Sequence, residues 1–324
     1  MTTAHAIQVG RTGGPEVLQL AEIDLPEPGP GQAAVAIAAT GVNFIDIYQR
    51  SGVYSRPLPF TPGSEGAGTV TAVGAGVDSV LVGERVAWVG VPGSYADATI
   101  APVGELVPVP DGVDLDVAAA VMLQGMTAHY LAFSVHPIQP GEAVLIHAGA
   151  GGVGLVLTQI AKIRGARVIT TVSTAEKGAL SRGAGADEVL VGYDGFPEKV
   201  RALTDGVGVA VVYDGVGKDT FDGSLASLRP RGMMALFGGS SGQVPPFDLQ
   251  RLNSGGSLVV TRPTLRDFTA SRDEILGRAT DLFGWIADGR LDVRIGGRYP
   301  LADAGRAHED LAARRTTGKL LLIP

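Results

Sequence analysis

The stretch HAGAGGVG at residues 147–154 decides the fold of this chain. Three of its glycines carry the pattern G-x-G-x-x-G: Gly149, Gly151 and Gly154. The pattern gains meaning here because it follows an apolar segment, residues 142–148, and opens a predicted helix, residues 151–164. In that setting the glycines permit a tight turn, a close approach to a pyrophosphate and close helix–strand packing. We interpret the stretch as a dinucleotide-binding loop; the alternative is a glycine-rich turn in a nucleotide-free sheet.

Strands and helices alternate along this part of the chain. The predicted strands are apolar, β-branched segments at residues 142–148, 166–172, 187–193, 209–217, 232–239 and 257–263. Helices are predicted between them at residues 151–164, 174–184, 196–204 and 219–228. Because parallel strands need crossover connections, this alternation predicts a doubly wound parallel six-stranded sheet. We assign residues 124–265 to it as a Rossmann domain.

Residues 1–123 have a different texture. Short β-branched segments separated by Gly and Pro predict a mainly antiparallel or barrel-like domain, with strands at residues 32–42, 66–77, 84–90 and 105–110. Residues 43–52 predict a short helix that ends at Gly52.

The tail, residues 266–324, combines both kinds of segment. An amphipathic helix is predicted near residues 271–288, with Gly289 as its left-handed cap. A short strand, a helix near residues 302–313 and a final strand KLLLIP follow. We expect the tail to pack back on residues 1–123, which makes the first domain discontinuous.

Composition limits the functions open to the chain. With 45% hydrophobic and 18% charged residues over 324 positions, the chain can form about two folded domains. The net charge of −7 argues against nucleic acid or an anionic membrane as the main partner. The absence of cysteine excludes disulfides, thiolate nucleophiles and cysteine-ligated metals. No secretory signal is visible and no apolar run approaches the roughly 20 residues of a membrane helix, so we expect a cytoplasmic protein.

The end of the second predicted strand of the Rossmann domain distinguishes between the two nicotinamide cofactors. An NAD-binding unit usually carries an acid there, about 20 residues beyond the glycine loop, to hold the ribose hydroxyls. This chain has Ser173 at that place and Lys177 one helical turn later, whereas Glu176 lies inside the next helix. A hydroxyl leaves room for a 2′-phosphate and an ammonium pairs with it, so we favour NADPH over NADH. The alternative for Lys177 is a solvated lysine on the helix face.

Two further patterns suggest chemistry but have simpler explanations. GGSSG at residues 238–242 matches the hydrolase nucleophile elbow G-x-S-x-G, but two prolines follow where a helix must start. We interpret it as a ligand-facing loop at the carboxyl end of the fifth strand. No two of the five histidines are spaced as metal ligands. We expect His147 to pack beside the glycine loop, His136 to lie in a loop and His308 to lie on an ordinary helix surface.

These features together resemble the medium-chain dehydrogenase/reductase superfamily and, within it, the zinc-independent NADPH:quinone oxidoreductases, the zeta-crystallin-like group. The matching pieces span the chain: GGPEVLQL (13–20), TGVNFIDIYQRSGVY (40–54), LQGMTAHYL (123–131), HAGAGGVG (147–154), YDGVGKDTF (213–221), FGGSSG (237–242), TRPTL (261–265) and GRAHEDLAARRTTGKLLLIP (305–324). The resemblance implies an α/β chain with a GroES-like mainly-β barrel domain, residues 1–123 and 266–324, and a Rossmann domain, with NADPH in the cleft between them. It also implies a homodimer or homotetramer, for which the apolar edge strand SLVVTRP (257–263) is a candidate contact.

The resemblance implies a site without metal. Zinc enzymes of the superfamily have a cysteine where this chain has Asn43, a histidine where it has Ser64, and a third ligand near residues 124–125. With no Lewis acid, the substrate should accept hydride readily, as quinones and conjugated enones do. The groups we place at the reaction are Asn43, to hydrogen-bond the acceptor or cofactor, and Tyr48 or Tyr54, to steady an oxyanion. The alternative for Tyr54 is an aromatic residue that covers the cleft.

The glycine loop and the resemblance together predict the cofactor contacts. They are Phe44, Ile45, Asp46, Tyr48, Thr127, Tyr130, Gly149, Gly151, Gly152, Val153, Gly154, Ser173, Lys177, Tyr193, Phe237, Gly238, Ser240, Ser241, Arg262 and Arg314. Three functions stay open: reduction of quinones by hydride or single electrons, reduction of 2-alkenal or enone double bonds, and NADPH binding without turnover.

TPGSEGAG at residues 61–68 places a carboxylate, Glu65, inside a segment of small residues. We interpret Glu65 as a buried structural carboxylate, paired with a base such as Arg85 or held by backbone N–H groups. A direct catalytic role is the alternative.

Overall fold

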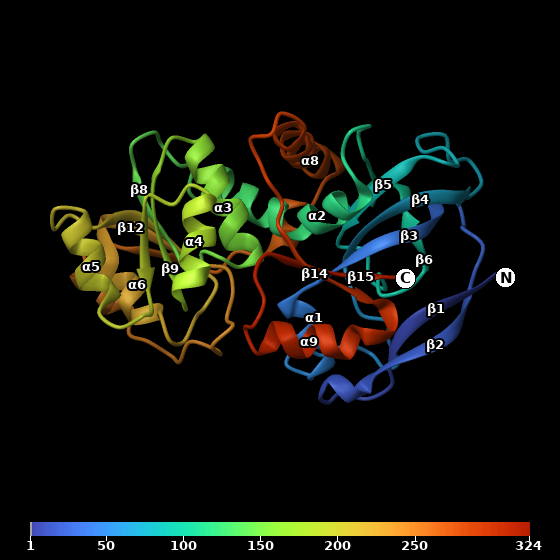
Figure 1. The fold of residues 1–324 in the computed structure, drawn as a ribbon, viewed down its shortest axis with the longest axis horizontal. Helices are drawn as coiled ribbons and strands as arrows, with labels where there is room; N and C mark the ends of the chain where they lie inside the picture. The colour runs from blue at the N-terminus through green and yellow to red at the C-terminus, as the bar shows by residue number, and fades with distance from the viewer. Residues whose placement is uncertain (1) are drawn as a thin grey trace. The chain divides into compact units, whose positions relative to one another are not determined.

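The computed structural model describes residues 2–324, which form two compact units (Figure 1). The β-rich unit runs to Leu123 and takes up Thr269–Gly289 and Val293–Pro324. The Rossmann unit comprises Gln124–Phe268 with Arg290–Asp292. Each unit encloses buried apolar clusters of its own, as a domain requires.

A six-stranded parallel sheet forms the centre of the Rossmann unit. Its strands are β8 (Ala143–Ile146), β9 (Arg167–Val172), β10 (Glu188–Val191), β11 (Val209–Asp214), β12 (Leu228–Leu236) and β13 (Val259–Thr261). They lie in the order β10-β9-β8-β11-β12-β13 and every pairing is parallel. This is the strand order of a dinucleotide-binding doubly wound sheet, and the predicted fold class is confirmed.

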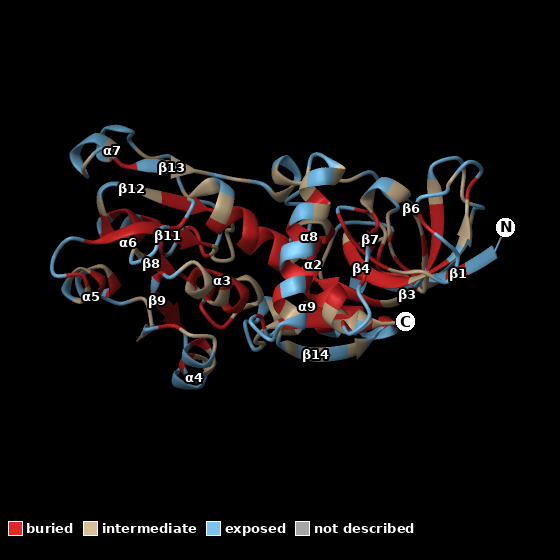
Figure 2. Ribbon diagram, turned by 90° about the horizontal axis from the view of Figure 1, so that it is seen from above, coloured by how far each residue is buried: buried red, intermediate tan, exposed pale blue. Residues whose placement is uncertain are grey.

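Helices connect these strands and cover the sheet. They are α3 (Gly152–Ile163), α4 (Ala175–Gly183), α5 (Phe196–Leu203), α6 (Phe221–Ser227) and the short α7 (Gln250–Ser254). Helix α3 packs against α4, and α5 packs against α6, as expected for two pairs that cover a doubly wound sheet. The central strands β8, β9 and β11 are largely buried (Figure 2), which explains their continuous apolar sequences.

The β-rich unit is built on a mainly antiparallel sheet of the order β14-β15-β3-β4-β5-β7, with β6 also paired to β3. Its strands are β3 (Gln32–Val42), β4 (Glu65–Val73), β5 (Arg85–Val89), β6 (Ala98–Pro102), β7 (Val107–Pro108), β14 (Ile295–Pro300) and β15 (Lys319–Ile323). Only β14 and β15 pair in parallel among these described strands. A separate antiparallel hairpin joins β1 (Thr2–Val9) and β2 (Leu18–Leu25), which the sequence did not predict.

The tail of the chain contributes helices and the last two strands to the β-rich unit. Helix α8 (Arg272–Ala287) begins with a capping box between Ser271 and Glu274 and ends at Gly289, whose φ of 70° confirms the predicted cap. Helix α9 (Ala304–Ala312) packs against α1 (Phe44–Arg50). Strand β15 pairs with β3, so the sheet joins the two ends of the sequence.

Helix α2 (Leu115–Tyr130), which continues in a π-helical turn to Val135, was missed from the sequence. Its apolar residues surround the helix instead of forming one face, so no helical period stands out. Over its 21 residues it is apolar enough to cross a membrane, so the expectation that no apolar run approaches that length was wrong. Because 78% of its apolar 18-residue stretch is buried inside the protein, it has the character of a core helix.

Candidate functional site

The glycine loop connects β8 to α3 at the carboxyl edge of the parallel sheet. A side chain on Gly149 would come within 2.8 Å of Thr170 and Ser181, and one on Gly154 within 2.9 Å of the Gly149 Cα. A side chain on Gly151 would meet only the Ala148 carbonyl, at 3.2 Å. The first and third glycines are therefore required for packing, whereas the second leaves its surroundings open for a ligand.

The start of α3 has the properties of an anion site. Within the described residues no side chain caps it, because its N-cap residue is Gly151. The first N–H groups of a helix have no partner inside the helix, and the helix dipole favours negative charge there. Ala148, just before the loop, has a φ of 53°, a conformation that residues other than glycine rarely adopt. The arrangement suits a pyrophosphate held by backbone N–H groups.

The end of β9 places the predicted cofactor-choosing residues at the same edge of the sheet. Ser173 is exposed directly after the strand, and Thr174 caps α4 by accepting the Lys177 backbone N–H at 3.3 Å. Glu176 lies in the first turn of α4, and its pKa falls below the usual value because its own backbone N–H and the Thr174 hydroxyl bond to it. Glu176 is thus engaged locally, and the contact of Ser173 and Lys177 with a 2′-phosphate stays a prediction.

The loops after β11 and β12 pack on one another at this edge. A side chain on Gly238 would approach the Gly215 Cα within 2.8 Å. The Ser241 hydroxyl donates to the Val216 carbonyl at 2.8 Å and accepts the Asp219 N–H at 3.0 Å. No helix begins in the described residues 242–249, so GGSSG is a loop and not a nucleophile elbow.

A buried carboxylate, Asp214, fixes the loop after β11. Its Oδ1 accepts the backbone N–H groups of Val216 at 2.8 Å and Gly217 at 2.9 Å. Its Oδ2 accepts the hydroxyls of Thr220 at 2.7 Å and Ser224 at 2.8 Å. Four short local hydrogen bonds therefore stabilise this completely buried carboxylate.

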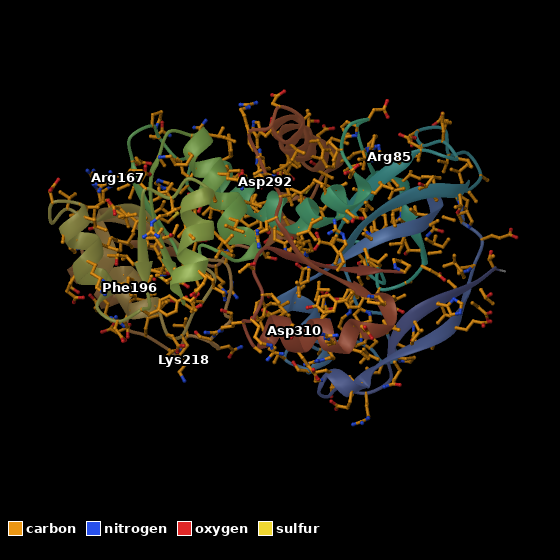
Figure 3. All side chains as sticks on the ribbon, viewed as in Figure 1. Arg85, Arg167, Phe196, Lys218, Asp292 and Asp310 are labelled. Carbon is orange, nitrogen blue, oxygen red and sulfur yellow. The ribbon has the colours of Figure 1, made fainter. Side chains whose placement is uncertain are left out.

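His147 joins this network from the end of β8. Its Nδ1 lies 2.7 Å from the Thr171 hydroxyl and its Nε2 lies 3.0 Å from Ser224 Oγ. Since Ser224 donates its proton to Asp214, its oxygen accepts from His147 Nε2–H. Burial lowers the pKa of His147 to about 4, although Asp214 acts to raise it. The edge of the Phe196 ring, labelled in Figure 3, packs against the imidazole with centroids 4.9 Å apart.

The sequence predicted only packing for His147 and did not single out Asp214 or Ser224. Together these three residues have the types of a hydrolase triad. All three are fully buried and Ser224 donates to the carboxylate, so the serine is no nucleophile. The network instead ties β8, β9, β11 and α6 together beneath the glycine loop.

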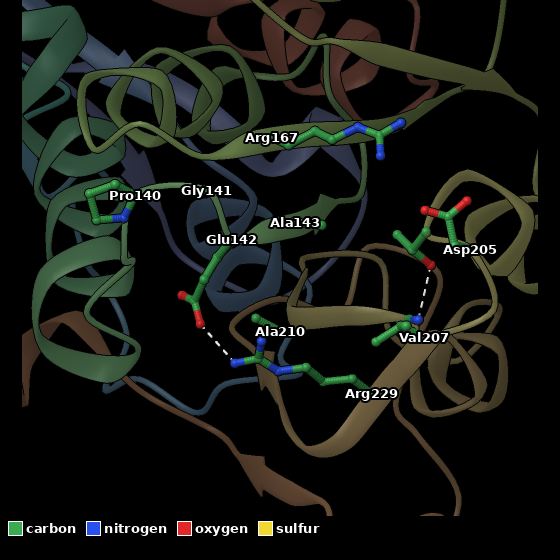
Figure 4. A pocket seen from close by; sticks show the side chains of 11 residues that line it. Pro140, Gly141, Glu142, Ala143, Arg167, Asp205, Val207, Ala210 and Arg229 are labelled. Atoms are coloured by element: carbon green, nitrogen blue, oxygen red, sulfur yellow. Dashed lines mark hydrogen bonds and ion pairs between the residues drawn. The ribbon is translucent and has the colours of Figure 1, made fainter.

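The amino edge of the same sheet carries a surface hollow of about 490 Å³ (Figure 4). Glu142 and Arg229 face one another across it, in an ion pair of 2.8 Å. Burial acts to raise the pKa of Glu142, but the Gln139 N–H, His136 and Arg229 together lower it. His136 lies in a loop as predicted, bonded to Glu142 at 3.0 Å. This hollow lies at the opposite edge from the glycine loop, so none of the predicted site residues line it.

In the β-rich unit, helix α1 presents aromatic residues that were predicted to contact substrate and cofactor. The rings of Phe44 and Tyr48 lie 6.2 Å apart, and Tyr54 packs edge-on against Tyr48 at 5.5 Å. Tyr54 and Ile45 are exposed. These side chains form an accessible aromatic cluster suited to stacking on a flat ligand.

Asn43, the N-cap residue of α1, is buried instead. Its Nδ2 donates to Glu65 Oε1 at 2.6 Å, and its Oδ1 accepts from Lys319 Nζ at 2.9 Å. Both ends of the amide are therefore engaged inside the protein. A ligand contact of Asn43 stays a prediction, and this geometry gives the side chain a structural role as well.

Glu65 is the buried structural carboxylate that TPGSEGAG predicted. The predicted backbone N–H partner is confirmed, but the base that pairs with it is not Arg85. It forms an ion pair with Lys319, and its Oε2 accepts the Leu123 N–H at 2.7 Å. Arg85 (labelled in Figure 3) donates to the Val113 carbonyl, so pairing with Arg85 was the wrong prediction. The surrounding glycines allow tight packing: a side chain on Gly63 would collide with the ring of Tyr95.

A second buried chain of hydrogen bonds starts at Asp46. Its Oδ2 accepts the Asn43 N–H at 2.8 Å and the Tyr95 hydroxyl at 3.0 Å, and Tyr95 lies 3.0 Å from His308 Nε2. Burial raises the pKa of Asp46 to about 7 and lowers that of His308 to about 3, with Arg50 also lowering the latter. His308 is thus completely buried and its assignment to a helix surface was wrong, because α9 turns this face toward α1. Asp46 is likewise turned into the core, which leaves only its backbone for a predicted cofactor contact.

The remaining predicted contacts are distributed over both units. Thr127 and Tyr130 are buried in α2, where the Tyr130 ring stacks on Phe268 at 4.5 Å. Arg262 is exposed and donates to the Leu236 carbonyl at 2.8 Å. Arg314 is exposed in the β-rich unit. Partly exposed residues complete the set: Gly152, Val153, Tyr193, Phe237 and Ser240.

Side chains of the types that bind metal ions are few in this site. Across residues 2–324 no group of three or more His, Cys, Asp or Glu side chains lies together as a metal site would require. At the positions of the zinc ligands, Asn43 is engaged with Glu65 and Lys319, and Gln124 packs within 3.0 Å of where a Gly152 side chain would lie.

Comparisons with known proteins agree with this architecture. Residues 29–111 match the family described as alcohol dehydrogenase GroES-like domain, and residues 152–282 match that described as zinc-binding dehydrogenase. A quinone oxidoreductase of Pseudomonas aeruginosa is 46% identical over 99% of this chain and 100% of its own length. The chain belongs to the quinone oxidoreductase family of the medium-chain dehydrogenases/reductases. The predicted resemblance is confirmed.

Solved members and relatives of the family are similar over their whole length. A mycobacterial protein in complex with NADPH is 53% identical, with a TM-score of 0.95 over 99% of this chain and 100% of that one. The Escherichia coli quinone oxidoreductase in complex with NADPH is 42% identical, with a TM-score of 0.96 over 100% of both chains. A 2-haloacrylate reductase of Burkholderia sp. is 40% identical over 98% of both chains.

Proposed function

We propose that this protein is an NADPH-dependent quinone oxidoreductase. The observation that carries the proposal is the carboxyl edge of the Rossmann sheet, where the uncapped start of α3 and the open Gly151 lie at the same edge as Ser173 and Lys177. The acid in the next helix, Glu176, is engaged by Thr174 and by its own backbone instead of being available for a ribose. Relatives solved with NADPH, and relatives named quinone oxidoreductase, support it. The net reaction is quinone + NADPH + H⁺ → hydroquinone + NADP⁺.

The chain's own residues divide the work of binding. We assign the pyrophosphate to the N–H groups of Gly152 and Val153 at the start of α3, and the 2′-phosphate to Ser173, Lys177 and Tyr193. When bound, NADPH supplies the hydride from its nicotinamide ring. The Asp214 network holds the loop after β11 at the edge where the cofactor is assigned. We propose residues 124–265 as the cofactor domain and residues 1–123 with 266–324 as the catalytic domain.

The aromatic cluster on α1 is assigned to the acceptor. Phe44, Tyr48 and Tyr54 provide flat, partly exposed rings, and we assign the tyrosine hydroxyls to bond a quinone oxygen. We propose that the reaction runs without zinc, and that catalysis rests on holding the acceptor against the reduced cofactor in a dry site.

A panel of acceptors tests the function. NADPH and NADH oxidation is followed with 1,4-benzoquinone, a naphthoquinone and a 2-alkenal, and bound metal is measured on the same protein. We expect quinone turnover with NADPH, little with NADH, and no stoichiometric zinc. Binding of NADPH without turnover of any acceptor would instead identify a storage or sensing protein. Detection of a semiquinone by electron paramagnetic resonance separates single-electron from hydride transfer.

A second candidate is reduction of an activated carbon–carbon double bond. The similarity to a 2-haloacrylate reductase favours it, and such acceptors also need no Lewis acid. A kcat/KM for 2-alkenals or 2-haloacrylates above that for every quinone would select this function.

We further propose a cytoplasmic homodimer or homotetramer. The edge strand β13 supports this, since Val259 is 44% exposed on a strand that has one neighbour in the described sheet. Light scattering of the wild type and of Val259→Lys tests it, with dissociation expected for the variant.

A further inference from the structure

The β-rich unit contains a buried lysine ammonium. Of the five lysines of the chain, all within the described residues, only Lys319 is buried, with 2% of its side chain exposed. Its Nζ contacts Glu65 Oε1 and donates to Asn43 Oδ1 at 2.9 Å and to the Val42 carbonyl at 3.2 Å. An ammonium has three N–H donors, and these three oxygens accept all of them. The ammonium is therefore coordinated as a bound cation would be.

The surrounding chain is shaped to hold this pair. A side chain on Gly41 would collide with the Glu65 carboxylate and with Lys319 Cε. Glu65 is completely buried, and its second oxygen accepts the Leu123 N–H at 2.7 Å. Burial lowers the pKa of Lys319, whereas the Glu65 carboxylate acts to raise it. A buried pair of this kind stabilises little by its charge alone, so its geometry calls for another explanation.

The geometry bears on Asn43. Lys319 fixes the oxygen of the Asn43 amide, and Glu65 fixes its nitrogen at 2.6 Å, so the amide has one orientation. The Asn43 backbone N–H donates to Asp46 at 2.8 Å, and this bond sets the start of α1. The next residues of α1 include Phe44 and Tyr48, which form the aromatic cluster. A shift at Asn43 is thus transmitted directly to the rings assigned to the acceptor.

We propose that Lys319 is a positioning residue, whose ammonium acts as a resident cation that orients Asn43 and the start of α1 for the quinone. This proposal rests on the proposed function for its effect on catalysis. The cation site itself stands on the contacts of Lys319, Glu65, Asn43 and Gly41. The proposal also predicts that a shortened side chain at position 319 leaves a site for a small primary ammonium ion.

The first test is Lys319→Met, which keeps the apolar length and removes the cation. At a temperature where circular dichroism shows every variant folded, we expect kcat/KM for the quinone to fall about 10- to 100-fold. The KM for NADPH should rise less than kcat/KM for the quinone falls, because the phosphate contacts assigned to the Rossmann unit are untouched and only the predicted contacts at α1 are shifted. The matched control is Lys162→Met, which breaks a partly exposed ion pair with Asp187 and should leave all constants unchanged. If Lys319→Met does not fold, Lys319→Gln replaces it under the same criteria.

The second test is chemical rescue of Lys319→Ala. Propylammonium replaces the atoms removed, from Cγ to Nζ, whereas tetramethylammonium has the charge but no N–H donor. We expect millimolar propylammonium to raise kcat/KM for the quinone at least fivefold and tetramethylammonium to have no effect, in line with three donated hydrogen bonds.

Two results would overturn the proposal. One is a kcat/KM for Lys319→Met that equals the wild-type value after correction for the folded fraction. The other is that propylammonium raises the melting temperature of Lys319→Ala but leaves its kcat/KM unchanged. That result would mean that Lys319 has only a structural role. Failure of the proposed function is seen separately, as absence of quinone turnover in the wild type. In that case a melting temperature of Lys319→Ala that rises with propylammonium still supports the cation site, and an unchanged one rejects it.

Discussion

Each of the two units buries a carboxylate at the centre of a polar network, and the two networks are built in opposite ways. Asp214 in the Rossmann unit is held by four uncharged donors, all within ten residues of it. Glu65 in the β-rich unit is paired with a full charge, Lys319, which lies 254 positions away in sequence. The Asp214 carboxylate is therefore held by four short hydrogen bonds from residues near it in sequence. The Glu65 carboxylate depends instead on the charge of one residue that is distant in sequence, Lys319.

The largest loss of stability should follow from removing the carboxylate at the centre of the Rossmann network. Asp214→Ala leaves the donors of Val216, Gly217, Thr220 and Ser224 unpaired, which we expect to cost about 5 kcal/mol of unfolding free energy. Urea unfolding followed by far-UV circular dichroism measures it. The control Asp222→Ala removes an exposed ion pair and should cost less than about 0.5 kcal/mol. A loss below about 1 kcal/mol for Asp214→Ala would show that water replaces the carboxylate and that the network is not essential.

Because the buried His147 of the Rossmann network is neutral, we predict that the free energy of unfolding depends on pH. The pKa of His147 is about 4 in the folded protein and 6.5 in the unfolded chain, so protons bind preferentially to the unfolded state between these values. The contribution of His147 to stability is complete above pH 6.5 and declines as the pH falls toward 4, by at most about 3 kcal/mol. His147→Gln should remove this slope.

Unfolding free energies of wild type and His147→Gln at pH 4.5, 5.5 and 7 measure the difference. His308 adds a slope of the same sign, and Asp46, whose pKa is raised to about 7, one of opposite sign, but both remain in the variant and cancel from the comparison. Parallel pH curves for the two proteins would mean that folding does not lower the pKa of His147.

Much of the Rossmann unit could be predicted from sequence because its signals are local. The glycine loop and the Ser173 to Lys177 segment are short stretches, and successive strands alternate with helices, so the doubly wound parallel sheet could be predicted from them. The network around Asp214 is also local, but buried Asp, Thr and Ser in a turn look like ordinary turn residues. Only the burial of His147 beside them reveals the connection.

The β-rich unit was harder because its decisive contacts are distant in sequence. Arg85 was predicted as the partner of Glu65 since it lies near in sequence, whereas β15 brings Lys319 beside β3 from the far end of the chain. The same distance hid the contact of His308 with Tyr95, 213 positions apart. Helix α2 was missed for another reason: it is buried on all sides, so it shows no helical period.

A glycine substitution tests how closely the Glu65–Lys319 pair is packed. Gly41→Ala forces a methyl group against the Glu65–Lys319 pair, and we expect a loss of about 2 kcal/mol. The control is Gly277→Ala in the exposed middle of α8, where nothing lies within 4 Å of the new methyl group. That variant should gain about 0.5 to 1 kcal/mol from helix propensity. Melting temperatures that fall equally for both variants would exclude close packing of the ion pair as the reason for Gly41.

The smallest effect concerns the exposed counterpart of Lys319. Lys177 lies at the ligand-facing edge of the Rossmann sheet and is only partly buried, so Lys177→Ala should leave the unfolding free energy within about 0.5 kcal/mol. Because the ammonium is assigned to the 2′-phosphate of NADPH, we expect the KM for NADPH to rise about tenfold while turnover of NADH is unchanged. Lys199→Ala, on the exposed face of α5, serves as the control. An unchanged KM for NADPH would reassign Lys177 to the solvated helix face, and the contrast between a lysine that orders its own domain and one that selects a ligand would then rest on Lys319 alone.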